Sequence, residues 1–300
     1  MSVAAAARPV TDYALTVCEV SGRGLAGVSL AVLPGEIIAV VGPAGAGKST
    51  LLHIASGCVT PPAGEARIYG MPVVSEAARH LVGYAREVPA FPSALTVGEV
   101  LSYYARLHAS NGRPTSRGLA REALELAGLA AAGDLRVGTL SRADLHRLAL
   151  AQAALGGRRV LLLDETLSGL DAVARRDLSR RLARLASTGV AILLAARDLA
   201  ALDRVAGRVV VLRAGRVVRA GPLAALLAER VLEVILDAPP PEPPPGFRVT
   251  AAGIEAPLAG RTVEAVLALC RAHRLAVRAS RVRVKSLEEI VLETHDAPAR

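Results

Sequence analysis

Aromatic side chains are scarce in this 300-residue chain: they make up 2% of it, and tryptophan is absent. A hydrophobic core therefore has to be built from aliphatic side chains. With 52% hydrophobic residues, the chain has enough of them for one large domain and a small appendage. Long apolar runs are also missing, because arginine interrupts every candidate before the roughly 18 residues that a membrane-spanning helix needs. The sequence therefore predicts no transmembrane segment.

Cysteine is rare and widely spaced, with single residues at Cys18, Cys58 and Cys270. An odd number at these distances argues against a disulfide framework or a cysteine-rich metal site, and indicates reduced thiols in the cytoplasm. The first ten residues have no charged start followed by a long apolar stretch, so we expect no signal peptide.

Lysine is almost absent: the 36 basic residues include only Lys48 and Lys285, and all others are arginine. The formal net charge of +9 fits a solvated arginine-rich surface, with binding to anionic lipid or nucleic acid as the alternative. The lysine kept at position 48 indicates a place for a compact ammonium group. Such a group fits between phosphates, where a planar guanidinium does not.

The segment around Lys48 fits the phosphate-binding pattern G-x-x-x-x-G-K-[ST], between an aliphatic strand and an aliphatic helix. Glycines there let backbone N–H groups surround a phosphate at a helix start, whose dipole adds attraction. We expect Lys48 to bridge the β- and γ-phosphates of a nucleotide and the Ser49 hydroxyl to bind Mg²⁺. The predicted nucleotide-binding residues are Gly42, Pro43, Ala44, Gly45, Ala46, Gly47, Lys48, Ser49 and Thr50.

A second aliphatic strand, 160–164, ends in Asp164 and is followed by Glu165. A carboxylate at a strand end beside a phosphate-binding loop is suited to holding Mg²⁺, and we assign this role to Asp164. A carboxylate one residue further is suited to polarising the water that attacks the γ-phosphate. We therefore expect Glu165 to be catalytic.

Short aliphatic strands alternate with helical segments through the first 225 or so residues. This α/β pattern is typical of a mainly parallel sheet covered by helices. Thr96 and Glu99 form a capping box that opens a helix over 97–108, inside a helical subdomain at about 88–156. The whole domain is expected to span 12–228. Its strands are predicted at 14–20, 28–32, 36–41, 160–164, 190–195 and 208–212, with a hairpin ending at 216–221; a second helix is predicted at 119–128.

Residues 229–300 are expected to form a small α/β accessory domain. The run 238–246 is too rich in proline for a helix or an inner strand, so it is predicted to be an exposed loop. The run separates segment 231–237 from segment 247–256, and helices are predicted at 262–274 and 286–294. No internal repeat is apparent, so the chain holds one nucleotide-binding domain.

The tract from Asp164 to Asp171, about 120 residues beyond Lys48, resembles the Walker B motif and D-loop of ABC transporter ATPases. Segment 140–155 occupies the position of that family's signature helix. The resemblance covers roughly residues 14–225 and implies a P-loop NTPase core with ATP and Mg²⁺ as cofactors. It also implies head-to-tail pairing with a second ABC ATPase chain, with Asp171 in the D-loop. The signature residues acting on the partner's ATP would be Ser141, Arg142 and Ala143.

The signature departs from the family's Leu-Ser-Gly-Gly-Gln, because Arg142, Ala143 and Asp144 replace Gly-Gly-Gln. The glycines let the helix N-terminus approach the partner's γ-phosphate, and side chains obstruct that approach. Ser141, with Asp144 three residues later, also has the pattern of an ordinary helix cap. We expect a helix that keeps its cap while its grip on phosphate is weakened.

Three further family positions differ. Glu87 replaces the Q-loop glutamine; its carboxylate can bind Mg²⁺ or its water, but adds negative charge near the γ-phosphate. Arg197 replaces the switch histidine; it either donates to a γ-phosphate oxygen or faces solvent, and it cannot act as a neutral imidazole. Segment 17–30 has no aromatic residue to stack on adenine, so nucleotide affinity should come mostly from the phosphates.

The tail 286–293 is similar to the end of the subgroup whose separate permeases export drugs, antibiotics, polysaccharides or lipids. The expected function is therefore the ATP-binding subunit of an ABC exporter, peripheral on the cytoplasmic face of the cell membrane, with reduced ATPase activity. Its expected partners are a membrane permease and a second ABC ATPase chain, identical or different.

Two alternatives within the family are a regulatory or nucleotide-sensing protein and the degenerate half of a heterodimer. A nucleic-acid-associated ATPase is disfavoured by the single cassette, by the exporter-like tail and by the lack of a basic-aromatic tract, so no nucleic acid partner is expected. The transported cargo cannot be read from these residues.

Overall fold

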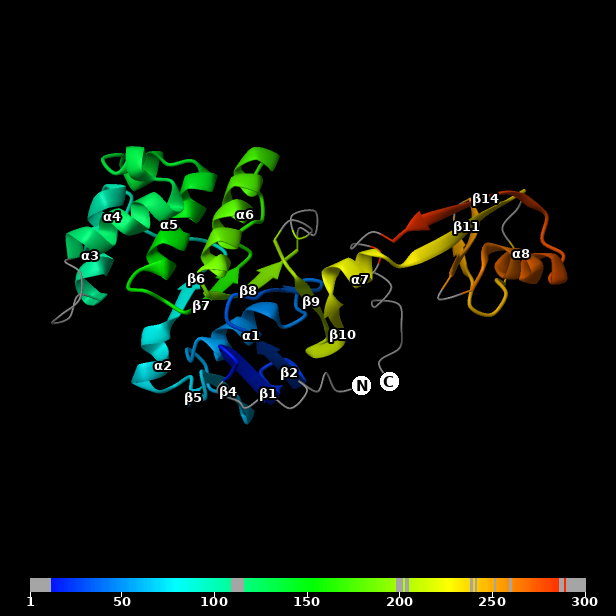
Figure 1. The fold of residues 1–300 in the computed structure, drawn as a ribbon, viewed down its shortest axis with the longest axis horizontal. Coiled ribbons are helices and arrows are strands. Elements are labelled where there is room, and N and C mark those ends of the chain that lie inside the picture. Colours follow the sequence, from blue (N-terminus) through cyan, green and yellow to red (C-terminus); the bar gives the residue numbers. More distant parts are fainter. Residues whose placement is uncertain are drawn as a thin grey trace. The chain divides into compact units, whose positions relative to one another are not determined.

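The structure is a computed structural model that describes residues 12–108, 116–197, 202, 205–237, 240, 242–250, 252–258, 261–285 and 289. The chain divides into two compact units, Met1–Gly221 and Pro222–Arg300 (Figure 1). The sequence pattern placed the start of the accessory domain at residue 229. Helix α7 (Leu223–Leu227) falls in the second unit.

A six-stranded sheet organises the first unit, in the order β10-β9-β3-β8-β7-β6. β3 pairs in parallel with β8 and β9, and β7 pairs in parallel with β6 and β8. Every residue of β3, β7 and β8 is buried, as expected for inner parallel strands covered on both faces. The carboxyl ends of these strands therefore share one edge. The strands are β3 (Ile37–Val41), β6 (Val82–Ala85), β7 (Val160–Asp164), β8 (Ala191–Ala196), β9 (Arg208–Arg213) and β10 (Arg216–Pro222).

A separate four-stranded sheet contains the first two strands of the chain, in the order β2-β1-β4-β5. Its pairs are antiparallel, which corrects the expectation that 14–20 and 28–32 belong to the mainly parallel sheet. The reason is the two-residue turn Arg23-Gly24, both with positive φ, since so short a connection joins only antiparallel strands. The strands are β1 (Leu15–Gly22), β2 (Leu25–Val32), β4 (Ala63–Ile68) and β5 (Met71–Pro72).

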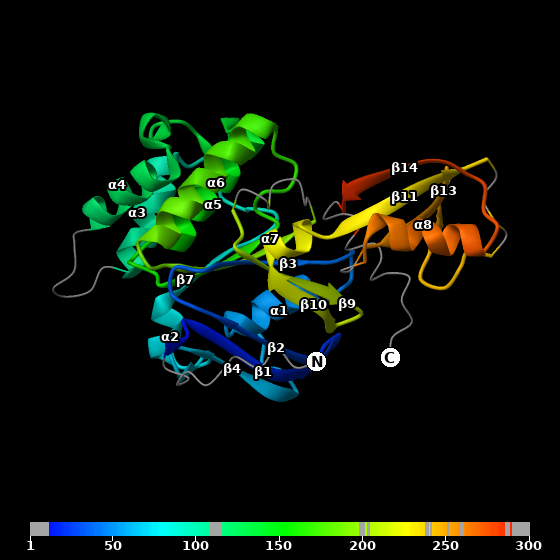
Figure 2. The same ribbon diagram turned by 45° about the vertical axis from the view of Figure 1, so that its right-hand side comes forward.

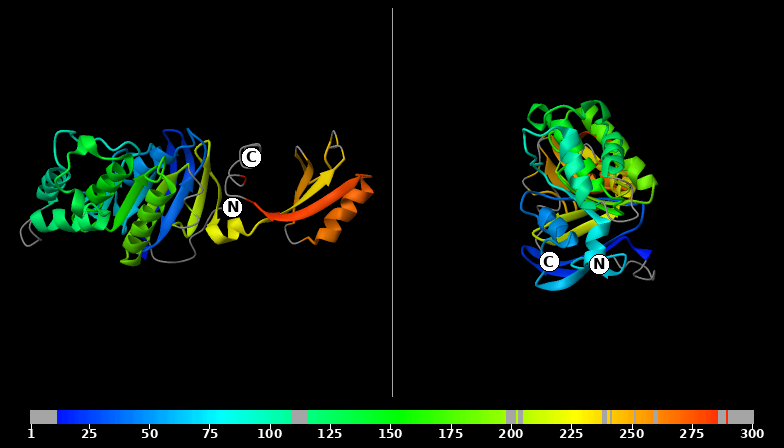
Figure 3. Two further views of the ribbon diagram at one scale, coloured as in Figure 1. Left: turned by 90° about the horizontal axis from the view of Figure 1, so that it is seen from above. Right: turned by 90° about the vertical axis from the view of Figure 1, so that its left-hand side faces the viewer.

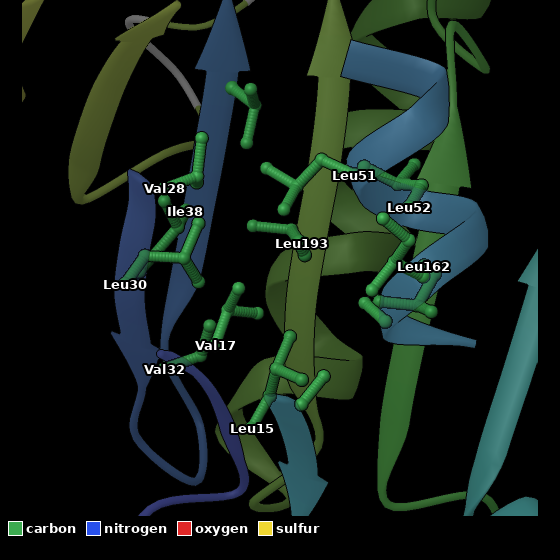
Figure 4. Packing of buried hydrophobic residues seen from close by; sticks show 14 of the residues in the cluster. Leu15, Val17, Val28, Leu30, Val32, Ile38, Leu51, Leu52, Leu162 and Leu193 are labelled. Atoms are coloured by element: carbon green, nitrogen blue, oxygen red, sulfur yellow. The ribbon is translucent and has the colours of Figure 1, made fainter. Parts of the chain in front are cut away.

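Helix α1 (Lys48–Ala55) lies between the two sheets and fills the space between them with aliphatic side chains (Figure 4). Leu51 and Leu52 belong to the same buried cluster as Leu15 of β1 and Leu193 of β8. The core is almost entirely aliphatic, as the shortage of aromatic residues requires. The phosphate-binding loop is thus fixed at the start of a helix that is packed on both sides.

Helices lie beside β6, at one edge of the six-stranded sheet, and over the sheet face that is turned away from α1 (Figure 3). α3 begins with the predicted capping box, in which Thr96 N donates to Glu99 Oε2 at 2.8 Å and Glu99 N to Thr96 Oγ1 at 3.2 Å. α3, α4 and α5 share a hydrophobic cluster of their own. The helical elements are α2 (Glu76–Leu81), α3 (Val97–His108), α4 (Ser116–Ala127), η2 (Ala130–Ala132), η3 (Val137–Thr139), α5 (Arg142–Ala154) and α6 (Ala172–Ser187).

The second unit is an antiparallel sheet in the order β12-β13-β11-β14. Helix α8 (Val263–Ala272) lies along this sheet (Figure 2). Its residues Val266 and Cys270 belong to the buried cluster of this unit. The described residues of the proline-rich run 238–246 form neither helix nor strand. The predicted helix 286–294 lies outside the described residues, apart from Glu289. The strands are β11 (Arg230–Leu236), β12 (Arg248–Thr250), β13 (Gly253–Pro257) and β14 (Val277–Val284).

The three cysteines are free thiols, as the sequence predicts, with Cys270 buried and the other two exposed. Across the parts of the chain that the structure describes, no helix has the length and apolar character needed to cross a membrane.

Candidate nucleotide-binding site

The loop before α1 depends on glycine at two positions. Gly47 precedes the helix in a left-handed conformation with φ 101°, and a Cβ there would lie 2.6 Å from Leu25 Cδ2. A Cβ on Gly42 would lie 2.1 Å from the carbonyl oxygen of Leu212. Any side chain at either position would therefore push the loop away from its neighbours. The glycine pattern holds the loop close to β9 and to the β1–β2 turn.

Lys48 lies along this loop with 6% of its surface exposed. Its Nζ donates to the carbonyl oxygens of Gly42 at 2.8 Å and Pro43 at 3.1 Å, and it lies 3.8 Å from Glu165 Oε1. Burial lowers the pKa of Lys48, and the charge of Glu165 opposes that shift. The loop therefore holds the ammonium group at the position that the sequence pattern predicts.

Ser49 and Asp164 meet beside the loop, with Ser49 Oγ donating to Asp164 Oδ1 at 3.2 Å. The second oxygen of Asp164 accepts from the Tyr84 hydroxyl at 3.3 Å, and Tyr84 lies 2.9 Å from Nε2 of His53. Burial raises the pKa of Asp164, although both hydrogen bonds oppose that shift. Burial and the neighbouring Asp164 also raise the pKa of Tyr84 above its ordinary range. Two predicted Mg²⁺ ligands are thus adjacent, and Tyr84 orients one of them.

Glu165 is held by contacts to both of its carboxylate oxygens. Oε2 accepts from Ser168 Oγ at 2.6 Å and from the backbone N of Arg197 at 3.0 Å, while Oε1 lies 3.0 Å from Arg197 Nε. The backbone of Glu165 is left-handed, with φ 50°, which is uncommon for a residue other than glycine. Only 3% of the residue is exposed. The strand end therefore fixes the direction of this side chain beside Lys48.

Arg197, at the end of β8, contacts two carboxylates rather than facing only solvent. It forms an ion pair with Glu165 and a second, very close one with Glu87. Both Arg197 and Glu87 are about half exposed, with 49% and 43% of their side-chain surfaces accessible. Glu87 is therefore turned towards Arg197, and it lines the same cavity as Ser49. Its role as a Mg²⁺ ligand stays a prediction.

A cavity of about 250 Å³ connects these groups. The β1–β2 turn at Arg23 and Gly24 forms part of its wall. Gly215 connects this turn to the phosphate-binding loop: Ala26 N donates to Gly215 O at 2.8 Å, and Gly215 N donates to Ala46 O at 3.1 Å. Its lining residues are Arg23, Gly24, Ala44, Gly45, Ala46, Gly47, Lys48, Ser49, Thr50, Glu87, Glu165 and Arg197. The cavity is therefore made mainly of the predicted nucleotide-binding residues.

The donor set fits Mg²⁺ bound together with a nucleotide. Mg²⁺ usually takes one or two protein oxygens and completes its shell with phosphate oxygens and waters. Ser49 and Asp164 supply two oxygens beside the loop whose N–H groups and lysine suit the phosphates. Within the described ranges, no cluster of three or more His, Cys, Asp or Glu residues forms a separate metal cage.

The predicted signature segment begins α5, and its side chains fold back onto the domain. Ser141 Oγ accepts from Asp144 N at 3.1 Å and donates to Asp144 Oδ2 at 2.7 Å, so the helix-cap pattern is present. Asp144 also pairs with Arg147 at 3.0 Å. The Arg142 guanidinium lies over Gly169, where an added Cβ would be 2.7 Å from its Cζ. The chain's own cavity lining, as described, includes none of the signature residues Ser141, Arg142 and Ala143.

Asp171, the predicted D-loop residue, caps the next helix. Its Oδ1 accepts from Val173 N at 2.9 Å and Ala174 N at 2.8 Å, the arrangement of an N-cap at the start of α6. The residue therefore fixes the start of α6 within this chain. A role towards a second chain stays a prediction.

Sequence reasoning missed three contributors to the site: Tyr84, Ser168 and Arg23. The Gly-Tyr pair ahead of Glu87 was the available signal for Tyr84. Ser168 lies in the tract 168–171 and is three residues beyond Glu165, a spacing that lets its hydroxyl return to the carboxylate. Arg23 had no local signal, because it reaches the cavity only through the pairing of β1 with β2.

Comparison with known proteins shows which family this part of the chain resembles. Residues 25–168, which contain the loop, Asp164 and Glu165, match the family described as ABC transporter. This part of the chain is similar to the ATP-binding domain of ABC transporters. Two solved structures are similar to the chain over about 70% of its length. An ATP-binding subunit of an ABC transporter has a TM-score of 0.62 and 27% identity, covering 71% of this chain and 91% of its own. The protein cbiO1 from Clostridium perfringens, part of the ABC transporter complex cbiONQ, has a TM-score of 0.65 and 26% identity, covering 72% and 91%.

Curated ABC relatives are similar over about half of the chain. The ATP-binding protein YxlF of Bacillus subtilis, described as uncharacterized, is 36% identical over 54% of this chain and 56% of its own length. A Nod factor export ATP-binding protein of Neorhizobium galegae is 36% identical, covering 53% and 46%. A sulfate/thiosulfate import ATP-binding protein of Methylococcus capsulatus is 35% identical, covering 55% and 49%. The chain thus spans about half the length of these relatives, and they include both an export and an import protein.

Proposed function

We propose that this chain is the ATP-binding subunit of an ABC exporter, which binds Mg-ATP and hydrolyses it slowly at a dimer interface to drive a separate membrane permease. The observation that carries the proposal is the cavity lined by Lys48, Ser49 and Glu165, with Asp164 hydrogen-bonded to Ser49. Phosphate binding, metal binding and water activation each have a residue there.

Each residue has a separate task in the proposed mechanism. Backbone N–H groups of the loop at Gly45 and Gly47 surround the β-phosphate, and Lys48 bridges the β- and γ-phosphates. Ser49 and Asp164 would hold Mg²⁺, which would neutralise charge on the phosphates.

Glu165 accepts a proton from the water that attacks the γ-phosphate. It is the suited base because it is almost fully buried beside Lys48, and because Ser168 and the Arg197 backbone fix its second oxygen. Its first oxygen is engaged by Arg197 Nε, so that contact has to give way or adjust when substrate binds.

We expect slow hydrolysis because of the signature segment at the start of α5, which would contact the ATP bound by a partner chain. In a head-to-tail dimer, the start of α5 would face the partner's γ-phosphate, and Arg142 and Asp144 occupy the positions of small or neutral residues there. An asymmetric heterodimer best accounts for an intact loop and Glu165 beside a weakened signature. In such a pair, this chain's loop and Glu165 would meet the partner's intact signature, and the partner's loop would meet the weakened signature of this chain. The permease places this subunit on the cytoplasmic face of the membrane, with no nucleic acid partner.

A nucleotide-sensing protein is the second candidate. The pair formed by Arg197 with Glu165 favours it, because a base held by an ion pair is less available to water. Association with a permease separates the two candidates. Capture of a membrane permease with the full-length chain from solubilised membranes supports the transport function, and capture of none in the presence of bound nucleotide supports sensing.

Lys48→Ala tests nucleotide binding itself. Equilibrium dialysis with Mg-ATP should show a loss of affinity of at least about tenfold, since the variant removes one charge-assisted contact to phosphate. Lys48→Arg should also bind weakly, because the planar guanidinium does not fit the loop carbonyls. Lys285→Ala, at the chain's other lysine, should bind like the wild type. Unchanged affinity in both Lys48 variants would contradict the proposed site.

A further inference from the structure

We propose that Glu87 and Arg197 act as one charge-compensating unit, in which Arg197 makes a glutamate tolerable at the γ-phosphate end of the cavity. The inference rests on the proposed ATP site and adds a positioning role that neither residue has alone. Its starting point is the contact between them: the two side chains, 110 positions apart in sequence, form an ion pair at the cavity wall.

The charges around the loop show why the two residues belong together. When ionised, Lys48 and Arg197 are positive, and three side chains are negative: Glu87, Asp164 and Glu165. With the uncharged glutamine and histidine of the family pattern, Lys48 would stay positive and Asp164 and Glu165 negative. Arg23, which also lines the cavity, adds the same positive charge to both sets. Both sets have the same net charge, so the two departures from the pattern cancel. Either departure alone would change the charge that a γ-phosphate meets.

The two residues depend on each other unequally. Arg197 has two acidic partners, because Nε lies 3.0 Å from Glu165 Oε1 while its terminal nitrogen contacts Glu87. Glu87 has Arg197 as its ion-pair partner among the described residues. Loss of Glu87 therefore leaves Arg197 paired with Glu165. Loss of Arg197 leaves Glu87 as an uncompensated negative charge on the cavity wall.

Arg197 also holds Glu165 through its backbone, and this contact survives a side-chain substitution. The Arg197 N–H donates to Glu165 Oε2 at 3.0 Å. Arg197→His should therefore keep the direction of Glu165 and change mainly the compensation of Glu87. The exposed pair itself should add little to folding stability, as is usual for half-exposed ion pairs. Its effect should appear when an anionic phosphate is brought close to Glu87.

A suppressor experiment on the full-length chain tests the proposal by measuring dissociation constants for Mg-ATP and Mg-ADP. Arg197→His should raise the dissociation constant for Mg-ATP about tenfold, which corresponds to about 1.4 kcal/mol, because Glu87 is no longer paired with a positive charge. The dissociation constant for Mg-ADP should stay within about twofold of the wild type. Adding Glu87→Gln to Arg197→His should restore Mg-ATP affinity to within about threefold of the wild type. Glu87→Gln alone removes one negative charge while Arg197 stays, so it should not weaken Mg-ATP binding.

A matched pair elsewhere on the same unit serves as the control. Glu65 and Arg67 form a surface ion pair at 2.8 Å, and they are absent from the described cavity lining. Glu65→Gln with Arg67→His should leave both dissociation constants unchanged. A double variant at 87 and 197 that binds Mg-ATP as weakly as Arg197→His alone would overturn the compensation. A wild-type chain that binds neither nucleotide would instead refute the proposed ATP site, so the two failures are distinguishable.

Discussion

At Asp164 and Glu165, the two carboxylates at the end of β7, the charge that the function needs opposes the stability of the fold. Asp164 and Glu165 are 4% and 3% exposed. A buried carboxylate loses hydration that hydrogen bonds replace only in part, and burial accordingly raises the pKa of Asp164. Without nucleotide, its ionised form weakens the fold. The same charge is what a bound Mg²⁺ needs, so the site is prepared for a ligand rather than for maximum stability.

Asp164→Asn should raise the Tm of the nucleotide-free chain at neutral pH, measured in chelator. The amide keeps an acceptor for Ser49 and places a donor towards Tyr84 without the buried charge. A folded-state pKa above the ordinary 3.8 means that ionisation costs stability as pH rises through that interval, and that the cost is fully present above it. The Tm difference, at about 2–4 °C per kcal/mol, should therefore shrink as pH falls towards 4.

The same variant should lose the stabilisation that Mg-ATP gives the wild type, because the metal ligand is gone. A lower Tm of Asp164→Asn in chelator, at neutral pH, would contradict the idea that this carboxylate opposes folding.

At the scale of elements, patterns local in sequence were predictable and pairings between distant segments were not. The buried strand 160–164 and the helix 97–108 match β7 and α3, because a run of four aliphatic residues and a capping box carry their own signals. β14 (Val277–Val284) was missed. Its residues are almost all exposed and three of them are arginine, so no buried face shows in its alternation. β4 (Ala63–Ile68) was missed for a similar reason, since its first three residues are exposed.

The candidate site followed the same division. The glycine loop and the Asp164–Glu165 pair were readable because each lies within one short segment. The contact of Arg197 with Glu87 was not, because it joins the end of β8 to the segment after β6 across the sheet. Sequence left Arg197 between a phosphate contact and a solvent-facing position, and the structure adds two carboxylate partners.

The start of α5 is the element that we expect to limit hydrolysis. Replacing Arg142 and Ala143 by glycine and Asp144 by glutamine should raise ATP turnover at least about tenfold in a self-paired chain, because the obstructing side chains are removed. The same change should lower the stability of α5, since glycine costs about 1 kcal/mol relative to alanine in a helix. Steady-state turnover and thermal unfolding, measured together, test both effects. Unchanged turnover would mean that the signature does not limit the reaction.

At the scale of the whole molecule, one intact loop and one weakened signature in the same chain favour pairing with a different cassette. Two copies of this chain would place the weakened segment at both nucleotides. A mixed pair would place an intact signature at this chain's Lys48 and Glu165. The second unit of the chain contains an antiparallel sheet with its own hydrophobic core, built around Leu232 and Ile254.

Glu165→Gln should therefore remain at the monomer mass of 30.9 kDa when Mg-ATP is added, as judged by sedimentation. The same substitution combined with the restored glycine signature should shift to twice that mass, because bound ATP is then held from both sides and is not hydrolysed. A dimer of Glu165→Gln with its native signature would contradict the preference for a mixed pair.

The most direct test of the central claim is steady-state ATP hydrolysis by the purified chain beside its Glu165→Gln variant, with Mg²⁺ present in both. We predict a slow wild-type turnover, on the order of 0.1 per second, that disappears in the variant, because Glu165 accepts the proton of the attacking water. Equal rates in the two proteins would contradict the account of this chain as an ATPase in its own right, and would mean that hydrolysis requires a partner with an intact signature.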